Sequence, residues 1–162
     1  MTAETLTATR AASTFPVAAG GPAGVLHCAY GVYEKDANAF EDGDIFEMCR
    51  IPANCTVVGG FFMADDLDTG TETLDIDIGW AANGVESADP DGFGNLGVLT
   101  GDAFAAGNLS AVAGLMYPLQ GTLLTDGPQS FSAETVIQLE ANAASNAGHT
   151  GTMSVVVYYI MQ

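Results

Sequence analysis

The chain has 162 residues, 48% of them hydrophobic, which suits one domain whose core is large enough to fold without metal or disulfide support. Its 20 acidic residues against 3 basic ones give a net charge of −17, which excludes binding to nucleic acid and to anionic membranes, because both need lysine and arginine. A solvated acidic surface that keeps an abundant protein dispersed is the simplest interpretation. A basic partner surface or divalent cations are the alternatives.

The start of the chain and its cysteines predict where the protein is made. The first residues lack the basic stretch and compact apolar segment of a signal peptide, and no apolar run approaches the roughly 20 residues of a membrane-spanning helix. Cys28, Cys49 and Cys55 form an odd set with no paired framework. We therefore expect reduced, mostly buried thiols in a protein made in the cytoplasm.

Residues 1–24 differ in composition from the rest of the chain. They are rich in threonine and alanine and contain Pro16, Pro22 and the pair Gly20-Gly21. We expect an extended N-terminal arm that is ordered only on a partner, with a plain disordered tail as the alternative. Residues 25–162 would then form the folded domain.

From residue 25 onward, apolar runs alternate with Gly, Asn, Asp and Pro, which predicts strand after strand. The first strand is expected over Val25–Glu34. The segments Asp44–Ile51 and Cys55–Met63 flank the turn Pro52-Ala53-Asn54 and together predict a β-hairpin. The pair Gly59-Gly60 predicts a bulge or a close backbone approach in the second arm of that hairpin.

The clearest strand is Leu74–Trp80, where every second residue is apolar while Asp75 and Asp77 fall on the opposite face. The alternation is that of a strand with one buried face.

Two later segments are also expected to be strands. Leu115–Leu124 contains Pro118, which places it at a sheet edge or at a break between two strands. Phe131–Asn142 alternates like a strand, although a helix starting at Ser132 is a competing interpretation.

The segment Thr152–Met161 is apolar on both faces, so it either runs centrally between two layers or faces a neighbouring subunit. In the second case Val156, Tyr158 and Ile160 would form a subunit interface. Seven or eight strands with few helix signals and no βαβ rhythm predict an all-β fold. We expect an antiparallel β-sandwich of jelly-roll type with an extended N-terminal arm.

Fifteen of the 20 acidic residues lie between positions 34 and 91, and two groups have the spacing of a cation-binding loop. The first group is Asp65, Asp66 and Asp68, and the second is Asp89 with Asp91. Carboxylates at alternate positions can converge on calcium, so these residues are the candidate metal ligands. The alternative is a pair of solvated Asp-Gly turns, in which case the protein has no cofactor.

The sequence offers no catalytic constellation. Neither His27 nor His149 sits in a recognisable motif, so we expect a protein that is not an enzyme. Trp80, Tyr30 and Tyr33 offer flat faces for stacking on a sugar, but Trp80 ends the apolar face of a strand and is expected in the core.

Three segments resemble small virion proteins of tailed bacteriophages, of the capsid decoration or cement type. They are Gly43–Gly60, with its Gly-Asp start and Ile-Pro turn, then Leu74–Trp80, and finally the closing strand Gly151–Tyr159. The likeness covers most of residues 25–162, and its motifs are structural and not chemical.

This resemblance implies a jelly-roll-like sandwich that is assembled on the outer capsid surface, commonly as a homotrimer, and stabilises the shell. The implied partners are the major capsid protein and further copies of the chain, after synthesis in the host bacterial cytoplasm. The acidic composition favours the outside of the particle over its DNA-filled interior. A tail, neck or head-fibre component with a carbohydrate-binding sandwich is the alternative.

Overall fold

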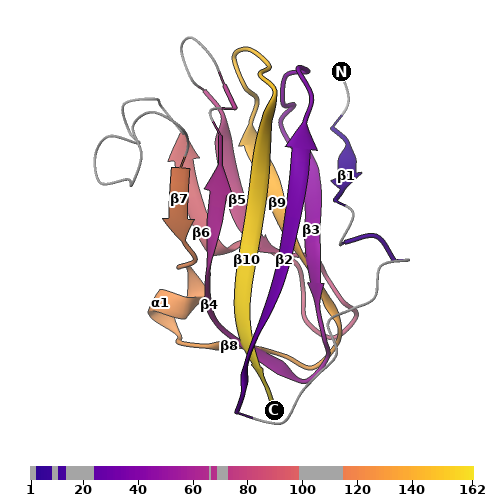
Figure 1. Ribbon diagram of the computed structural model, residues 1–162, viewed down its shortest axis with the longest axis vertical. Coiled ribbons are helices and arrows are strands. Elements are labelled where there is room, and N and C mark those ends of the chain that lie inside the picture. Colours follow the sequence, from indigo (N-terminus) through magenta and orange to yellow (C-terminus); the bar gives the residue numbers. More distant parts are fainter. Residues whose placement is uncertain (1–2, 9–10, 14–23, 66, 69–72, 99–114) are drawn as a thin grey trace.

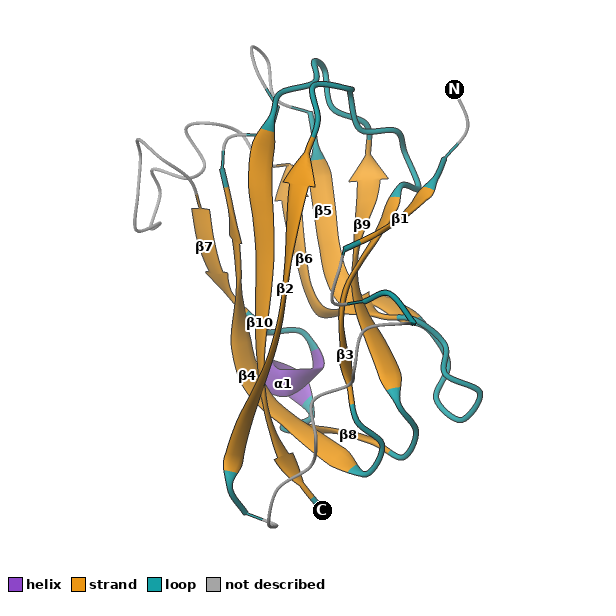
Figure 2. Cartoon of the chain, turned by 45° about the vertical axis from the view of Figure 1, so that its right-hand side comes forward, coloured by secondary structure: helices purple, strands orange, loops and turns teal. Residues whose placement is uncertain are grey.

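The computed structural model describes residues 3–8, 11–13, 24–65, 67–68, 73–98 and 115–162, which form two β-sheets packed face to face (Figures 1 and 2). The elements are β1 (Thr5–Thr7), β2 (Leu26–Lys35), β3 (Ile45–Ile51), β4 (Cys55–Ala64), β5 (Asp75–Trp80), β6 (Asp89–Val98), β7 (Leu115–Pro118), α1 (Thr122–Thr125), β8 (Gln129–Phe131), β9 (Thr135–Ala143) and β10 (Gly151–Met161). Among the described residues, no helix is long and apolar enough to cross a membrane.

The strand order is that of a jelly roll. Sheet A has the order β1-β3-β9-β5-β6, and sheet B has the order β2-β10-β4-β7, with β8 paired to β4. Strands β2 to β5 alternate between sheets B and A along the chain, and every pairing except β1 with β3 is antiparallel. The predicted fold class, an antiparallel jelly-roll sandwich, is confirmed.

The predicted hairpin of β3 and β4 is wrong. Strand β3 pairs with β9 and strand β4 pairs with β10, so residues 52–54 carry the chain from one sheet to the other. The segment lacks the Asn-Gly or Asp-Gly pair of a tight hairpin turn, and Asn54 adopts a positive φ of 56°. Its carbonyl accepts a hydrogen bond from the Gln162 amide at 2.9 Å, which ties the crossing to the end of β10.

Prolines and glycines explain the other differences from expectation. The strand expected over Leu115–Leu124 ends at Pro118, on the edge of sheet B, and α1 follows. The sequence predicts a loop or an Asp-Gly turn at Asp89 and Asp91, but these residues belong to β6 at the edge of sheet A, where Pro90 is tolerated. Thr135–Ala143 is a strand and not a helix, as expected.

The core between the sheets is built from the inward side chains of alternate strand residues. Trp80 packs against Phe93 and Phe131, with ring centroids 4.9 and 5.2 Å away. Its indole N–H donates a hydrogen bond to the Ser87 carbonyl at 3.0 Å. The expectation that Trp80 belongs to the core is therefore confirmed.

Two glycines allow close backbone approaches. A Cβ on Gly31 of β2 would overlap the Met48 backbone carbonyl of the opposite sheet, so only glycine fits there. A Cβ on Gly60 would overlap the Val156 carbonyl on the neighbouring strand. The register of β4 against β10 shifts next to this point, between Tyr158 and Tyr159, so the predicted bulge is confirmed.

Part of the N-terminal arm lies on its own domain. Strand β1 adds in parallel to the edge of sheet A, and the Ile45 amide donates to the Glu4 carbonyl at 2.8 Å. Ala8 and Ala11 are each 3% exposed. For these residues the expectation of an arm ordered only on a partner is wrong. Residues 14–23 lie outside the described residues, and the boundary at residue 25 stays a prediction.

Candidate interaction surfaces

The first group of predicted metal ligands has a structural role in this fold. Asp68 is 2% exposed, and its carboxylate accepts hydrogen bonds from the backbone amides of Thr73, Leu74, Asn146 and Ala147. Burial opposes ionisation, but these four hydrogen bonds lower the pKa of Asp68 below its usual value. Both oxygens of the carboxylate therefore already have partners.

Of the two neighbours of Asp68 in the motif, only Asp65 belongs to the described residues, and it has a partner of its own. Asp65 follows β4, and its carboxylate accepts the Thr152 amide at 2.8 Å. Asp66 lies outside the described residues.

The second group lies on strand β6 and not in a loop. Asp89 is paired in register with Trp80, and burial followed by a hydrogen bond with Asp91 raises the pKa of Asp89. Among the described residues, no three His, Cys, Asp or Glu side chains are placed to hold one metal ion. Calcium binding at these positions stays a prediction.

The outer face of sheet B is apolar, and we call it the apolar face. Strand β10 runs along its middle, between β2 and β4 (Figure 1). The inward residues Val155, Val157 and Tyr159 are fully buried, while the alternate residues point outward and are partly exposed. The apolar face consists of Leu26, Cys28, Tyr30, Val32, Val58, Phe61, Val156, Tyr158 and Ile160.

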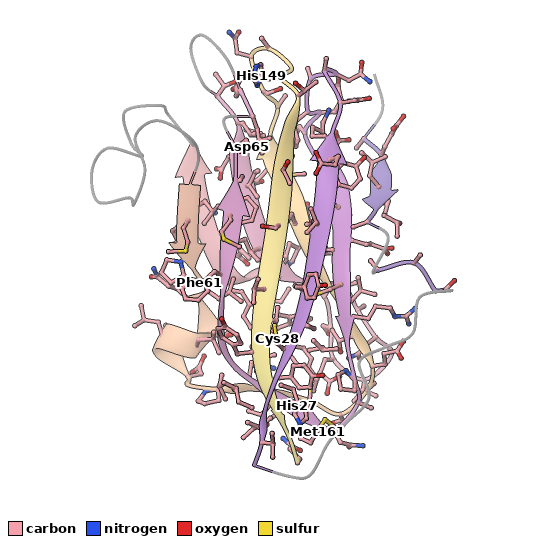
Figure 3. The ribbon with its side chains drawn as sticks, viewed as in Figure 1. His27, Cys28, Phe61, Asp65, His149 and Met161 are labelled. Carbon is pink, nitrogen blue, oxygen red and sulfur yellow. The ribbon has the colours of Figure 1, made fainter. Side chains whose placement is uncertain are left out.

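The predicted interface residues Val156, Tyr158 and Ile160 thus lie together in the middle of this face. Val156 is in register with Tyr30 on one side and Phe61 on the other, and the Phe61 ring meets Tyr158 edge-on at 6.1 Å. Figure 3 shows Phe61 and Cys28 on the strands that flank β10. Strand β10 is central in its sheet, and its outer side is partly exposed. That this side faces a neighbouring subunit stays a prediction.

The apolar face extends beyond the residues predicted for it. Leu26, Tyr30, Val32 and Val58 are between 40% and 59% exposed, which is unusual for side chains of this size gathered on one sheet. The β2 segment is apolar at every second position, which was visible in the sequence. Its place beside β10 was not visible, because strand pairing cannot be inferred from one segment.

On the outer side of sheet B, charge is confined to one end, beyond the apolar face. Glu34 is the only charged residue among the outward positions of β2, β4 and β10, all within the described part of the chain. It accepts a hydrogen bond from the Thr152 hydroxyl, near Asp65 at the upper end of the sheet in Figure 3. A chain with a net charge of −17 therefore presents one large uncharged surface.

The outer face of sheet A has the opposite character. Asp75 and Asp77 on β5, Glu140 on β9 and Asp91 on β6 point away from the core, and we call these four residues the acidic face. Asp77 is only 7% exposed. Burial, followed by repulsion from the other three carboxylates, raises the pKa of Asp77 to about 6.

The remaining candidate side chains pack against the protein. Tyr33 meets Phe46 edge-on at 5.2 Å, and His27 stacks on Tyr159 at 5.4 Å. His27 points inward and Cys28 outward, as expected for neighbours on a strand. Burial raises the pKa of the Cys55 thiol to about 11, with a smaller effect from Glu86, so this thiol is protonated at neutral pH.

No family model and no curated protein sequence matches the chain. Its fold is shared with chains of three solved phage capsid structures. A chain in the capsid of Ralstonia phage GP4 aligns over 98% of both chains, with a TM-score of 0.71 and 18% identity. A chain of the Cyanophage Pam1 capsid asymmetric unit aligns over 93% of this chain and 96% of that one, with a TM-score of 0.61 and 18% identity.

The third structure is the acidic stable capsid of Helicobacter pylori bacteriophage KHP30. One of its chains aligns over 86% of this chain and 90% of that one, with a TM-score of 0.50 and 12% identity. The protein therefore has a jelly-roll fold that also occurs in phage capsids. The alignments run through nearly the full length of both partners, so the likeness concerns the whole sandwich.

Proposed function

We propose that this protein is a structural component of a tailed-phage virion that binds the outer capsid surface and stabilises the shell. The observation that carries the proposal is the end-to-end likeness to a chain in the Ralstonia phage GP4 capsid. The exposed apolar face supports it, because a patch of this kind on a sheet is typical of a surface that is covered in an assembly. The strongly acidic composition supports a place away from the packaged DNA.

In this proposal the protein acts by binding to its neighbours and not by catalysis. Each copy buries apolar side chains against its neighbours, at about 25 cal/mol for each Å² removed from water. Many copies in a regular array would add these contributions across the joints between capsomers. Such an array would oppose the outward pressure of the packaged genome. The partners in this account are the major capsid protein and further copies of the chain.

Self-assembly through the apolar face is the second part of the proposal. Copies that each carry a charge of −17 repel one another, and the repulsion is smallest where the apposed surfaces carry no charge. In a homotrimer, three apolar faces turned toward the threefold axis would bury Val156, Tyr158 and Ile160 together.

Self-assembly is tested by Val156→Lys, which puts a charge in the middle of the apolar face. Val85→Lys is the matched control, because Val85 is 69% exposed and belongs to a loop outside that face. We expect sedimentation velocity to show concentration-dependent trimers for the wild type and for Val85→Lys, and monomers for Val156→Lys. A wild type that stays monomeric at every concentration would contradict this part of the proposal.

The stabilising role is tested on particles that lack the protein. We expect them to release DNA at a lower temperature than complete particles, and purified protein added back to restore the release temperature. Release at the same temperature with and without the protein would show that it does not reinforce the shell.

A further inference from the structure

The acidic face places like charges next to one another, and neither described basic side chain, Lys35 or Arg50, pairs with them. Asp77 lies directly opposite Glu140 on β9, and Asn95 faces it from β6. Like charges at opposite positions of an antiparallel pair are destabilising. Burial of Asp77 to 7% exposure adds to that cost, because it removes the water that would screen the repulsion.

Two carboxylate oxygens of the acidic face also lack hydrogen bonds. Oδ1 of Asp75 and Oδ1 of Asp77 are buried, and neither has a hydrogen-bond partner among the described residues. A buried charged acceptor is expected to have a partner, so an orphaned pair on one strand points to a ligand that supplies donors.

The described part of the chain does not supply the missing positive charge. Lys35 is buried at the end of β2, where its ammonium group contacts Asp36 at 2.8 Å and donates to the Asn38 carbonyl. Arg50 pairs with Glu134. Both described basic side chains are thus used elsewhere, and a cation for the acidic face would come from outside the molecule.

The shape of the acidic face favours a cationic side chain over a metal ion. Its four carboxylates are spread over three strands of a sheet, and no three of them are placed to hold one metal ion. A guanidinium group has five donors in a plane and can bridge two carboxylates that stand side by side. The Asp77 and Glu140 pair offers such an arrangement.

We propose that the acidic face docks on a basic surface of another protein, with an arginine or lysine side chain inserted between Asp77 and Glu140. This inference rests on the proposed function, in which the basic surface belongs to the capsid shell protein. The two outer faces of the sandwich would then have separate tasks. The apolar face would join copies of the chain, and the acidic face would hold them on the shell.

The test uses the isolated full-length protein and a capped tetra-arginine peptide as the probe. The double variant Asp77→Asn/Glu140→Gln removes two charges from the acidic face. The control Asp42→Asn/Asp126→Asn removes two charges from exposed acidic residues elsewhere. We expect calorimetry to show affinity at least about tenfold weaker for the first variant and within about twofold of wild type for the control.

Equal losses in both double variants would overturn the proposal, because they would reflect only the net charge of the molecule. If CaCl₂ alone shifted the NMR signals of Asp77 and Glu140 while the peptide did not, a metal site would replace the docking surface. If the double variant failed to fold, Asp91→Lys against Asp42→Lys provides the same comparison, because both side chains are exposed. The assay contains no virion, so its failure is distinguishable from failure of the proposed function.

Discussion

Replacement of Asp68 tests the interpretation that this carboxylate holds two loops together and does not primarily serve a metal. Its Oδ2 accepts the amides of Thr73, Leu74 and Asn146 at 2.7, 3.1 and 3.2 Å, and its Oδ1 accepts the amide of Ala147 at 3.0 Å. These bonds tie the segment that leads into β5 to the loop between β9 and β10.

Asp68→Asn keeps the size of the side chain but removes its charge and one acceptor. The new NH₂ group would face a backbone N–H, which leaves one amide without a partner and weakens the bonds to the other three. Hydrogen bonds to a charged group contribute about 1.5–3 kcal/mol each, so the expected loss in unfolding free energy is about 3–5 kcal/mol. For a chain of this length that corresponds to a melting temperature about 6–20 °C lower.

The assay is urea unfolding at neutral pH, with Asp65→Asn as the control, since Asp65 is exposed and accepts one amide. The lowered pKa of Asp68 means that its stabilising effect is present above the unfolded value of 3.8 and is lost as the pH falls through the folded value. The difference between wild type and Asp68→Asn should therefore shrink in acid.

A loss below about 1 kcal/mol for Asp68→Asn at neutral pH would refute the reasoning, because one ordinary hydrogen bond already contributes that much. An increase in wild-type melting temperature on adding CaCl₂, absent from Asp68→Asn, would instead support the calcium site predicted from the sequence.

The acidic face and the contact between the sheets give two further expected outcomes. The pKa of Asp77, raised from 3.8 to about 6, means that wild-type stability falls as the pH rises through that window. Asp77→Asn should therefore be more stable than wild type at pH 8, by about 1–2 kcal/mol after solvent screening, and the two proteins should be equally stable near pH 3. The measurement is urea unfolding, and a lower stability of Asp77→Asn at pH 8 would contradict this expectation. Gly31→Ala should lower the unfolding free energy by about 3 kcal/mol or more, because its Cβ would overlap the Met48 carbonyl. Ala29→Gly is the control on the same strand and should lower it by only about 1 kcal/mol, as measured by thermal unfolding. A Gly31→Ala protein that melts like wild type would show that the sheets can move apart.

Local alternation made much of the fold predictable. Alternation places Leu74–Trp80 in a strand with the buried face that the structure shows, and it marks the closing strand as apolar on both sides. The number of strands then implied a two-layered sandwich. These features depend on neighbours in sequence, so a period of two is sufficient to recognise them.

Features that depend on distant contacts were not predictable. The connection after β3 resembled a hairpin because each arm was a plausible strand, but β3 finds its partner in β9, more than 80 residues away. The local spacing around Asp68 suggests a calcium ligand, because the backbone donors at 146 and 147 that bind its carboxylate are remote in sequence and no local pattern shows them. The opposition of Asp77 and Glu140 likewise needs the register of two strands that no local pattern fixes.

We propose that the protein is a structural part of the virion, present as an array on the capsid. The most direct measurement is its copy number in purified particles, by quantitative mass spectrometry against the major capsid protein. We expect hundreds of copies, in a fixed ratio to the shell protein. A handful of copies would indicate a place in the tail, neck or head fibres. Absence of the protein from the particles would contradict a structural role in the virion.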